Sequence, residues 1–246
     1  YYCLWQGLWM CGGGAELTGR ARAALEACDL IVGYTAYIDL VRADFPQKET
    51  LSTGMRREVD RCRAAVEAAR TGKDVAVVCS GDSGVYGMAG LIYEVAQEYD
   101  PIEIEVVPGI TAACGGAAVL GAPLTHDFAV VSLSDLLTPW EKITARLTAA
   151  AQADFVLCLY NPASHSRPDY LQRARDILLS AGKDPATVCG TVRNIGRAGE
   201  EAALLTLGEL RDTQVDMFTT VFVGNSQTKV IGGKMVTPRG YLQRGE

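Results

Sequence analysis

The sequence predicts an α/β protein of two domains, 1–113 and 114–246, with the active site in the cleft between them. Short apolar runs alternate with helix-like segments, a pattern typical of βαβ units, so we expect a mostly parallel sheet in the N-terminal domain and a mixed sheet in the C-terminal one. Glycine turns follow the apolar runs 75–79 and 104–107. Ligands of parallel sheets bind beyond the carboxyl ends of the strands, where both turns would lie.

Composition indicates an ordinary globular protein. Hydrophobic residues make up 48% of the 246 positions, enough to bury a sizeable core. No apolar run reaches the roughly 18 residues of a membrane span, and the N-terminus lacks the basic start of a signal peptide. We therefore expect a cytoplasmic protein without membrane contact, and the net charge of −6 argues against a nucleic-acid partner.

The cysteines and arginines give weaker signals. Eight cysteines are spread singly, without a C-x-x-C pair, which favours buried reduced thiols over disulfides or a metal site. Arginine side chains are the usual partners of carboxylates, but we expect most of them here on solvated helix faces. They gather at Arg56, Arg57, Arg61 and Arg63, and again at Arg167, Arg173, Arg193 and Arg197.

The N-terminal half predicts alternating strands and helices. Residues 1–10 are apolar enough for a buried strand, which three glycines then break, and Thr18 is placed to cap the helix that follows. The other elements expected in this half are strand 30–34, a helix over 59–69 that stops at Gly72, strand 75–79, helix 91–99 and strand 104–107.

The C-terminal half begins with an unusual stretch of small residues. Residues 111–122 are mostly Ala and Gly, which predicts a helix that packs very closely against another surface. The later elements expected are strand 128–132, a helix after Pro139, strand 155–160, helix 170–179, strand 187–192, and a final antiparallel pair of 219–223 with 234–236.

Residues 80–90 (SGDSGVYGMAG) join a predicted strand to a predicted helix and carry four glycines. Such a turn leaves backbone N–H groups free to hold a ligand. Asp82 is its only charged residue and would repel a phosphate, so a ligand with an amine or ribose hydroxyls fits better. The alternative is a tight turn in which Asp82 only caps the helix.

Three ordered blocks resemble the signature segments of the tetrapyrrole methylases, the class III S-adenosylmethionine (SAM)-dependent methyltransferases. They are residues 80–85, 107–112 and 123–127. Segments 132–140, 160–167 and 237–241 resemble the branch of that family that methylates carbon 17 of precorrin-3B or cobalt-factor III in cobalamin biosynthesis. The resemblance extends from about residue 18 to residue 241.

The resemblance implies a SAM cofactor, S-adenosylhomocysteine as product, a tetrapyrrole substrate and a homodimer. It assigns cofactor contacts to Ser80, Gly81, Asp82, Val85, Thr111, Ala112, Asn161, Asn194 and Ile195. Substrate contacts are expected at Arg167, Ser164 and His165, with Arg167 the first choice for a substrate carboxylate.

The implied reaction is methylation at carbon 17 with ring contraction. Methyl transfer mainly requires alignment, whereas ring contraction would gain from a general acid or base. His126 beside Asp127 is the candidate for that role; the alternative is a structural hydrogen bond near Asp127.

One segment departs from the family pattern. The family opens with a Gly-x-Gly-Pro-Gly loop, and residues 7–14 here read GLWMCGGG. A non-catalytic SAM-binding module and another methyltransferase of the same family therefore remain alternatives. A relative that acts on RNA is a further alternative, against which the acidic balance weighs.

Overall fold

The computed structural model describes residues 3–6, 8–9 and 17–241. The chain divides into two compact units, Tyr1–Thr111 and Ala112–Glu246. The boundary expected after residue 113 falls in the first turn of helix α5 (Ala112–Leu120), which belongs to the second unit.

The N-terminal unit is built on a parallel sheet in the order β4-β3-β5-β1-β6, with the short β2 also paired to β5. Its strands are β1 (Cys3–Gln6), β2 (Leu8–Trp9), β3 (Leu30–Tyr34), β4 (Glu49–Thr53), β5 (Val75–Ser80) and β6 (Glu103–Val106). Its helices are α1 (Gly19–Ala27), α2 (Thr35–Arg42), α3 (Glu58–Arg70) and α4 (Ala89–Ala96).

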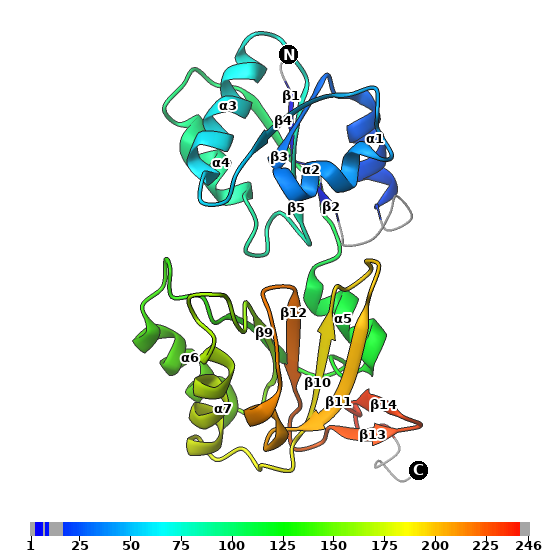
Figure 1. The fold of residues 1–246 in the computed structure, drawn as a ribbon, viewed down its shortest axis with the longest axis vertical. Helices are drawn as coiled ribbons and strands as arrows, with labels where there is room; N and C mark the ends of the chain where they lie inside the picture. The colour runs from blue at the N-terminus through cyan, green and yellow to red at the C-terminus, as the bar shows by residue number, and fades with distance from the viewer. Residues whose placement is uncertain (1–2, 7, 10–16, 242–246) are drawn as a thin grey trace. The chain divides into compact units, whose positions relative to one another are not determined.

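Helices cover both faces of this sheet, as Figure 1 shows. Leu30 and Val32 of β3 pack with residues of α3 and α4, whereas Ile31 packs with residues of α1 and α2. Because successive side chains of a strand point to opposite faces, a strand buried on both sides reads as a continuous apolar run. This explains why β3 and β5 were predicted within one residue of their observed ends.

Helix ends follow local chemistry. The Thr18 hydroxyl accepts a 3.2 Å hydrogen bond from the N–H of Ala21, so the predicted cap of α1 is confirmed. Helix α3 ends at Arg70, two residues before Gly72, whose φ of +100° favours glycine.

The elements that the sequence did not predict are α2, β4, the C-terminal strand β11 (Glu201–Thr206), the short strands β7 (Gly121–Ala122) and β13 (Lys229–Ile231), and the 3₁₀ turn Glu209–Asp212. Strands β4 and β11 lie at sheet edges and keep half-exposed, mixed side chains, so their sequences show neither alternation nor an apolar run.

The C-terminal unit holds a mixed sheet in the order β11-β10-β12-β9-β8, in which only β8 and β9 run parallel. Its strands are β8 (Phe128–Ser132), β9 (Val156–Tyr160), β10 (Val188–Arg193), β11 and β12 (Thr219–Val223), and its helices are α5, α6 (Trp140–Gln152) and α7 (Tyr170–Ser180), with a 3₁₀ turn at Glu209–Asp212. The predicted fold class, an α/β protein with a parallel and a mixed sheet, is confirmed.

The expected pairing of 219–223 with 234–236 is wrong. Strand β12 lies inside the mixed sheet between β10 and β9. A separate small sheet contains β7 (Gly121–Ala122), β13 (Lys229–Ile231) and β14 (Lys234–Val236), where β14 pairs with β13 and β7. Neither short segment identifies its partner strand by sequence, because long-range packing decides the pairing.

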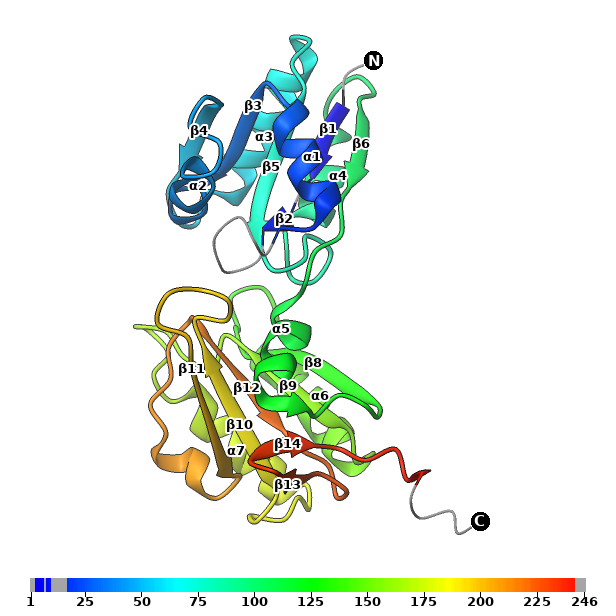
Figure 2. The same ribbon diagram turned by 90° about the vertical axis from the view of Figure 1, so that its right-hand side faces the viewer.

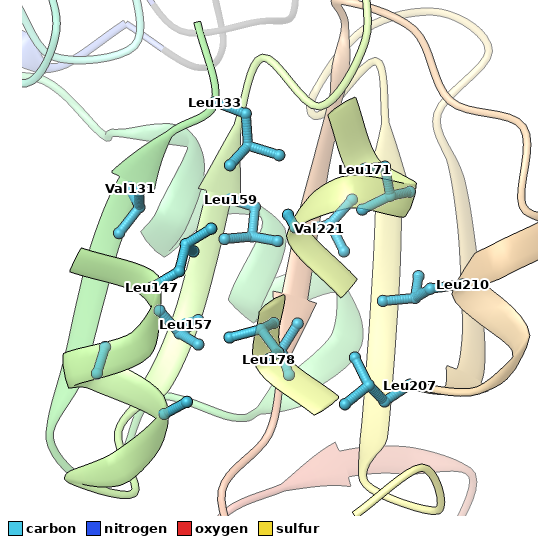
Figure 3. Close-up of a cluster of buried hydrophobic side chains, with 14 of the residues drawn as sticks. Val131, Leu133, Leu147, Leu157, Leu159, Leu171, Leu178, Leu207, Leu210 and Val221 are labelled. Atoms are coloured by element: carbon cyan, nitrogen blue, oxygen red, sulfur yellow. The ribbon is translucent and has the colours of Figure 1, made fainter. Parts of the chain in front are cut away.

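The two faces of the mixed sheet carry different packing. Val221 and Val223 face the apolar cluster under α6 and α7, shown in Figure 3. Phe222 points to the other face, where α5 lies, and Figure 2 shows α5 and α7 on opposite sides of the sheet. A side chain at Gly116 would place its Cβ 2.8 Å from the Phe222 ring. The small residues of α5 are therefore used within the unit.

Five of the six described thiols are buried and free, as expected, and the exposed Cys114 differs. Cys28, Cys62, Cys79, Cys158 and Cys189 are free and buried, and Cys114 is free and exposed. In the parts of the chain that the structure describes, helices are too short or too polar to span a bilayer.

Candidate active site

The loop after β5 folds back on itself before α4 begins. The N–H of Val85 donates to the Asp82 carbonyl at 3.0 Å, and the N–H of Ala89 donates to the Ser83 carbonyl at 3.1 Å. Gly87 lies so close to Ser83 that a Cβ there would be 2.5 Å from the Ser83 carbonyl oxygen. This compact turn therefore requires glycine for steric reasons.

Asp82 joins this loop to the turn after β6. One of its carboxylate oxygens accepts the N–H of Gly84 at 2.8 Å, and the other accepts the N–H of Gly109 at 2.9 Å. The alternative in which Asp82 only caps α4 is wrong, because Met88 occupies the cap position and no side chain bonds there. The two glycine turns expected at one sheet edge are thus physically connected.

The chemistry of this loop fits a cationic, hydroxyl-bearing ligand such as SAM. Residues 80–90 contain no basic side chain that would pair with a phosphate. The Ser83 hydroxyl is buried and has no hydrogen-bond partner among the described residues, and Asp82 supplies negative charge nearby. Ser80, Gly81, Asp82 and Val85, four of the predicted cofactor contacts, are brought together here, while Thr111 ends the same unit.

A second set of predicted contacts meets at the carboxyl ends of β8 and β9. Asn161 adopts φ +52° directly after β9, and its side-chain amide donates to the Ser132 hydroxyl at 3.0 Å. The Tyr160 hydroxyl accepts the N–H of Ala113 at 2.6 Å. The first turn of α5, which includes the predicted contact Ala112, is therefore held by Tyr160, the last residue of β9.

Asn194 and Ile195 follow β10. Asn194 has φ +51°, and its side chain donates to the Gly199 carbonyl at 3.3 Å, so it shapes its own turn. Ile195 is 5% exposed, and its Cδ1 would lie 3.0 Å from a Cβ at Gly116. Ile195 thus packs between its turn and α5.

Arg167 is bound within the protein. Its Nε donates to one oxygen of Asp135 at 2.6 Å, and the Tyr170 hydroxyl donates to the other at 2.5 Å. The hydrogen bonds from Tyr170 and Arg167 lower the pKa of Asp135. This cluster ties the loop after β8, which presents the 93%-exposed Leu137, to the turn after β9.

Ser164 and His165 line a hollow of about 400 Å³. The N–H groups of Ser164 and Arg167 each donate to the other's carbonyl, so His165 lies at the exposed tip of a tight turn. The wall opposite is formed by residues 213–218, including the half-exposed Met217 and Phe218. Two of the three predicted substrate residues are thus brought into one hollow, and Arg167 is not part of its lining.

His126 and Asp127 are placed elsewhere. They precede β8, whose carboxyl end carries Ser132, so the length of the strand, roughly 13 Å, separates them from the Asn161 turn. Both side chains are exposed, and the N–H of Asp127 donates to Nδ1 of His126 at 2.9 Å. The geometry favours the structural alternative over a catalytic role.

Arg61 was missed by sequence reasoning. It was grouped with solvated arginines, yet it is 3% exposed. Its position could have indicated burial, because it shares the helical spacing of the buried Cys62, Ala65 and Ala69 of α3.

Comparison with known proteins identifies the family. Residues 11–211 match the model of the Tetrapyrrole (Corrin/Porphyrin) Methylases. The chain belongs to the tetrapyrrole methylase family. This tetrapyrrole methylase is 49% identical over 231 residues to a probable cobalt-factor III C(17)-methyltransferase of Salmonella typhimurium, covering 94% of this chain and 95% of that protein.

Solved structures agree. The crystal structure of the methyltransferase CobJ superimposes on this tetrapyrrole methylase with a TM-score of 0.88 at 34% identity, covering 97% of this chain and 100% of that one. A uroporphyrin-III C-methyl transferase from Thermus thermophilus, complexed with S-adenyl homocysteine, shares the fold with a TM-score of 0.72 at 20% identity, covering 90% of this chain and 96% of that one. The predicted family is confirmed, and the individual contact residues stay predictions.

Proposed function

We propose that this tetrapyrrole methylase transfers a methyl group from SAM to carbon 17 of cobalt-factor III or precorrin-3B, with ring contraction, in cobalamin biosynthesis. The observation that carries the proposal is the 49% identity to a probable cobalt-factor III C(17)-methyltransferase across nearly the whole of both chains. The similarity to CobJ over 97% of the chain supports it.

SAM would supply a methyl group already activated on a sulfonium. The residues that would hold it are Ser80 to Val85 of the loop after β5, Ala112 in the first turn of α5, and Asn161 directly after β9. The loop fits because it offers hydroxyl and carbonyl acceptors and one carboxylate, and residues 80–85 carry no basic side chain.

The main task of the protein is alignment, which can lower a barrier by roughly 7–11 kcal/mol. Two hydrogen bonds serve that task. The Asp82 carboxylate accepts the N–H of Gly109 and so fixes the turn after β6. The Tyr160 hydroxyl accepts the N–H of Ala113 and so fixes the first turn of α5. No acid or base for ring contraction is assigned to His126, since it precedes the amino end of β8, whereas Tyr160 and Asn161 lie at the carboxyl end of the neighbouring parallel strand β9.

The expected homodimer stays a prediction, and one argument for it is withdrawn. The close-packing surface expected of the small residues of α5 could have been a dimer contact, but Gly116 packs against Phe222 of the same unit.

Methyl-transfer assays test the proposal. The purified protein is incubated with SAM carrying a ¹³C-methyl group and, separately, with precorrin-3B and cobalt-factor III. We expect a single labelled methyl at carbon 17 by NMR and an equal release of S-adenosylhomocysteine. Faster methylation of cobalt-factor III than of precorrin-3B would show that the enzyme prefers the cobalt-containing substrate, and the reverse order would show a preference for the metal-free one.

Two controls sharpen the result. His126→Ala is expected to keep turnover, and its loss would restore the catalytic expectation for that residue. If SAM binds but neither tetrapyrrole is methylated, the proposal fails in favour of the non-catalytic module, for which the altered glycine run at residues 7–14 is the supporting feature. Apart from Leu8 and Trp9 of β2, that run lies outside the described residues.

A further inference from the structure

Two residues with long side chains in the N-terminal unit have backbone angles in the left-handed region. Arg56 has φ +63° and Tyr86 has φ +53°. The other non-glycine residues described with positive φ are Asp154, Asn161 and Asn194, types that tolerate this conformation. For Arg and Tyr the conformation costs energy, and such strain persists where the surroundings enforce it, commonly at functional sites.

Both residues lie at the edge of the sheet where ligands bind. Arg56 follows β4, and Tyr86 lies in the loop that follows β5. These strands flank β3 in the parallel sheet, so their carboxyl ends face the same edge. Arg56 is exposed, and Tyr86 is 58% exposed.

The buried Arg61 fastens the two loops to each other. Its guanidinium donates to the Gly54 carbonyl at 3.1 Å and to the Met88 sulfur at 3.2 Å. Its Nε donates to the Thr53 hydroxyl at 2.8 Å. None of these partners is charged, so burying this cation is costly, which is expected where the position of the loops matters more than stability.

The charge around Arg56 is also unbalanced. Its neighbour Arg57 pairs with Asp60 at 2.6 Å. Arg56 itself has no ion pair among the described residues. A guanidinium of this kind binds carboxylates through paired hydrogen bonds, and an exposed phenol ring offers a flat apolar surface with one polar end.

We propose that Arg56 and Tyr86 form a substrate subsite for the tetrapyrrole, in which Arg56 binds a peripheral carboxylate and the Tyr86 ring contacts the conjugated macrocycle. The inference rests on the proposed function, because a tetrapyrrole carries both carboxylate side chains and a flat ring system. Arg61 acts as the positioning residue that keeps the two side chains in a fixed relation.

The test compares Arg56→Gly with the matched control Arg57→Ala. Losing a charge-assisted hydrogen bond should raise the KM for the tetrapyrrole about tenfold or more in Arg56→Gly. The SAM dissociation constant should not change, and the thermal midpoint should stay or rise, since glycine adopts this φ without strain. Arg57→Ala should leave all three values as in the parent protein, and Tyr86→Leu should raise the KM without changing SAM affinity.

A substrate-side readout makes the role of charge specific. Esterifying the tetrapyrrole carboxylates should weaken binding to the parent protein but add little to the defect of Arg56→Gly. An unchanged KM in Arg56→Gly, or equal losses for Arg57→Ala, would overturn the subsite. Failure of the proposed function would look different, because the parent protein would then methylate no tetrapyrrole.

Discussion

The backbone N–H of Gly109 donates a 2.9 Å hydrogen bond to the carboxylate of Asp82, which lies 27 positions earlier in the chain. The other carboxylate oxygen accepts the N–H of Gly84 at 2.8 Å. One side chain therefore connects the turns that follow β5 and β6.

Variants of Asp82 should distinguish two roles of its carboxylate: holding the two turns through hydrogen bonds, and contacting the ligand directly. Asp82→Ala removes both hydrogen bonds, so the free energy of unfolding should fall by about 1.5–3 kcal/mol, with at least a tenfold loss of SAM affinity. Asp82→Asn keeps one acceptor oxygen and should be intermediate in both urea unfolding and calorimetric SAM titration. If Asp82→Asn is intermediate in stability but binds SAM as poorly as Asp82→Ala, the negative charge itself contacts the ligand.

Glycines 87 and 90 form a matched pair in and beside the same loop. Gly87→Ala would force a Cβ against the Ser83 carbonyl, so we expect about 1–3 kcal/mol of destabilisation and loss of SAM binding. A Cβ at Gly90 meets no atom within 4 Å. Gly90→Ala should therefore be neutral or stabilise α4 by up to about 1 kcal/mol. Equal behaviour of the two variants in thermal unfolding would contradict the steric argument.

Tyr160→Phe tests how the start of α5 is held. The substitution removes the hydroxyl that accepts the N–H of the fully buried Ala113, and leaving that donor unpaired should cost about 1–3 kcal/mol. Hydrogen exchange should show faster exchange at Ala113 with little change in α7. An unchanged exchange rate at Ala113 would rule out this hydrogen bond as the anchor.

Arg167 and Asp135 should act as a unit. Because Arg167 is engaged by Asp135, both Arg167→Ala and Asp135→Asn should loosen the loop after β8 and raise the KM for the tetrapyrrole, with SAM affinity unchanged. Steady-state kinetics decides the point. An increase for Arg167→Ala alone would support the original assignment of Arg167 as a direct carboxylate partner.

Buried thiols predict a loss of stability at alkaline pH. Burial raises the pKa of Cys62, Cys158 and Cys189 to about 12, against 9.0 for an unperturbed thiol. The unfolded chain therefore loses these protons first as pH rises, so the stabilisation is complete below pH 9 and is lost between pH 9 and 12. Urea unfolding across that range should show the decline, which Cys158→Ala and Cys189→Ala should each reduce.

The structure was predicted best from the sequence in two places: where a strand is buried on both faces, and where steric contact in a turn permits only glycine. The apolar runs of β3 and β5 and the glycines of the loop after β5 belong to this group, because burial and steric contact restrict the residue types allowed. Three features could not be predicted in this way: the hydrogen bonds that Asp82 makes to two turns, the burial of Arg61, and the ion pair of Arg167 with Asp135. Each depends on a partner on a separate element, and a single side chain in a sequence does not reveal its distant partner.

The tight packing of α5 against Phe222 limits how the substrate preference of the protein can be engineered. With Gly116 against the ring, the helix has little room to move, and its first turn is held by the hydrogen bond from Ala113 to Tyr160. Changing substrate preference through α5 would therefore disturb folding and cofactor geometry together. The exposed Arg56 and Leu137 lie outside this packing, and libraries restricted to such positions should alter specificity with less loss of folded protein.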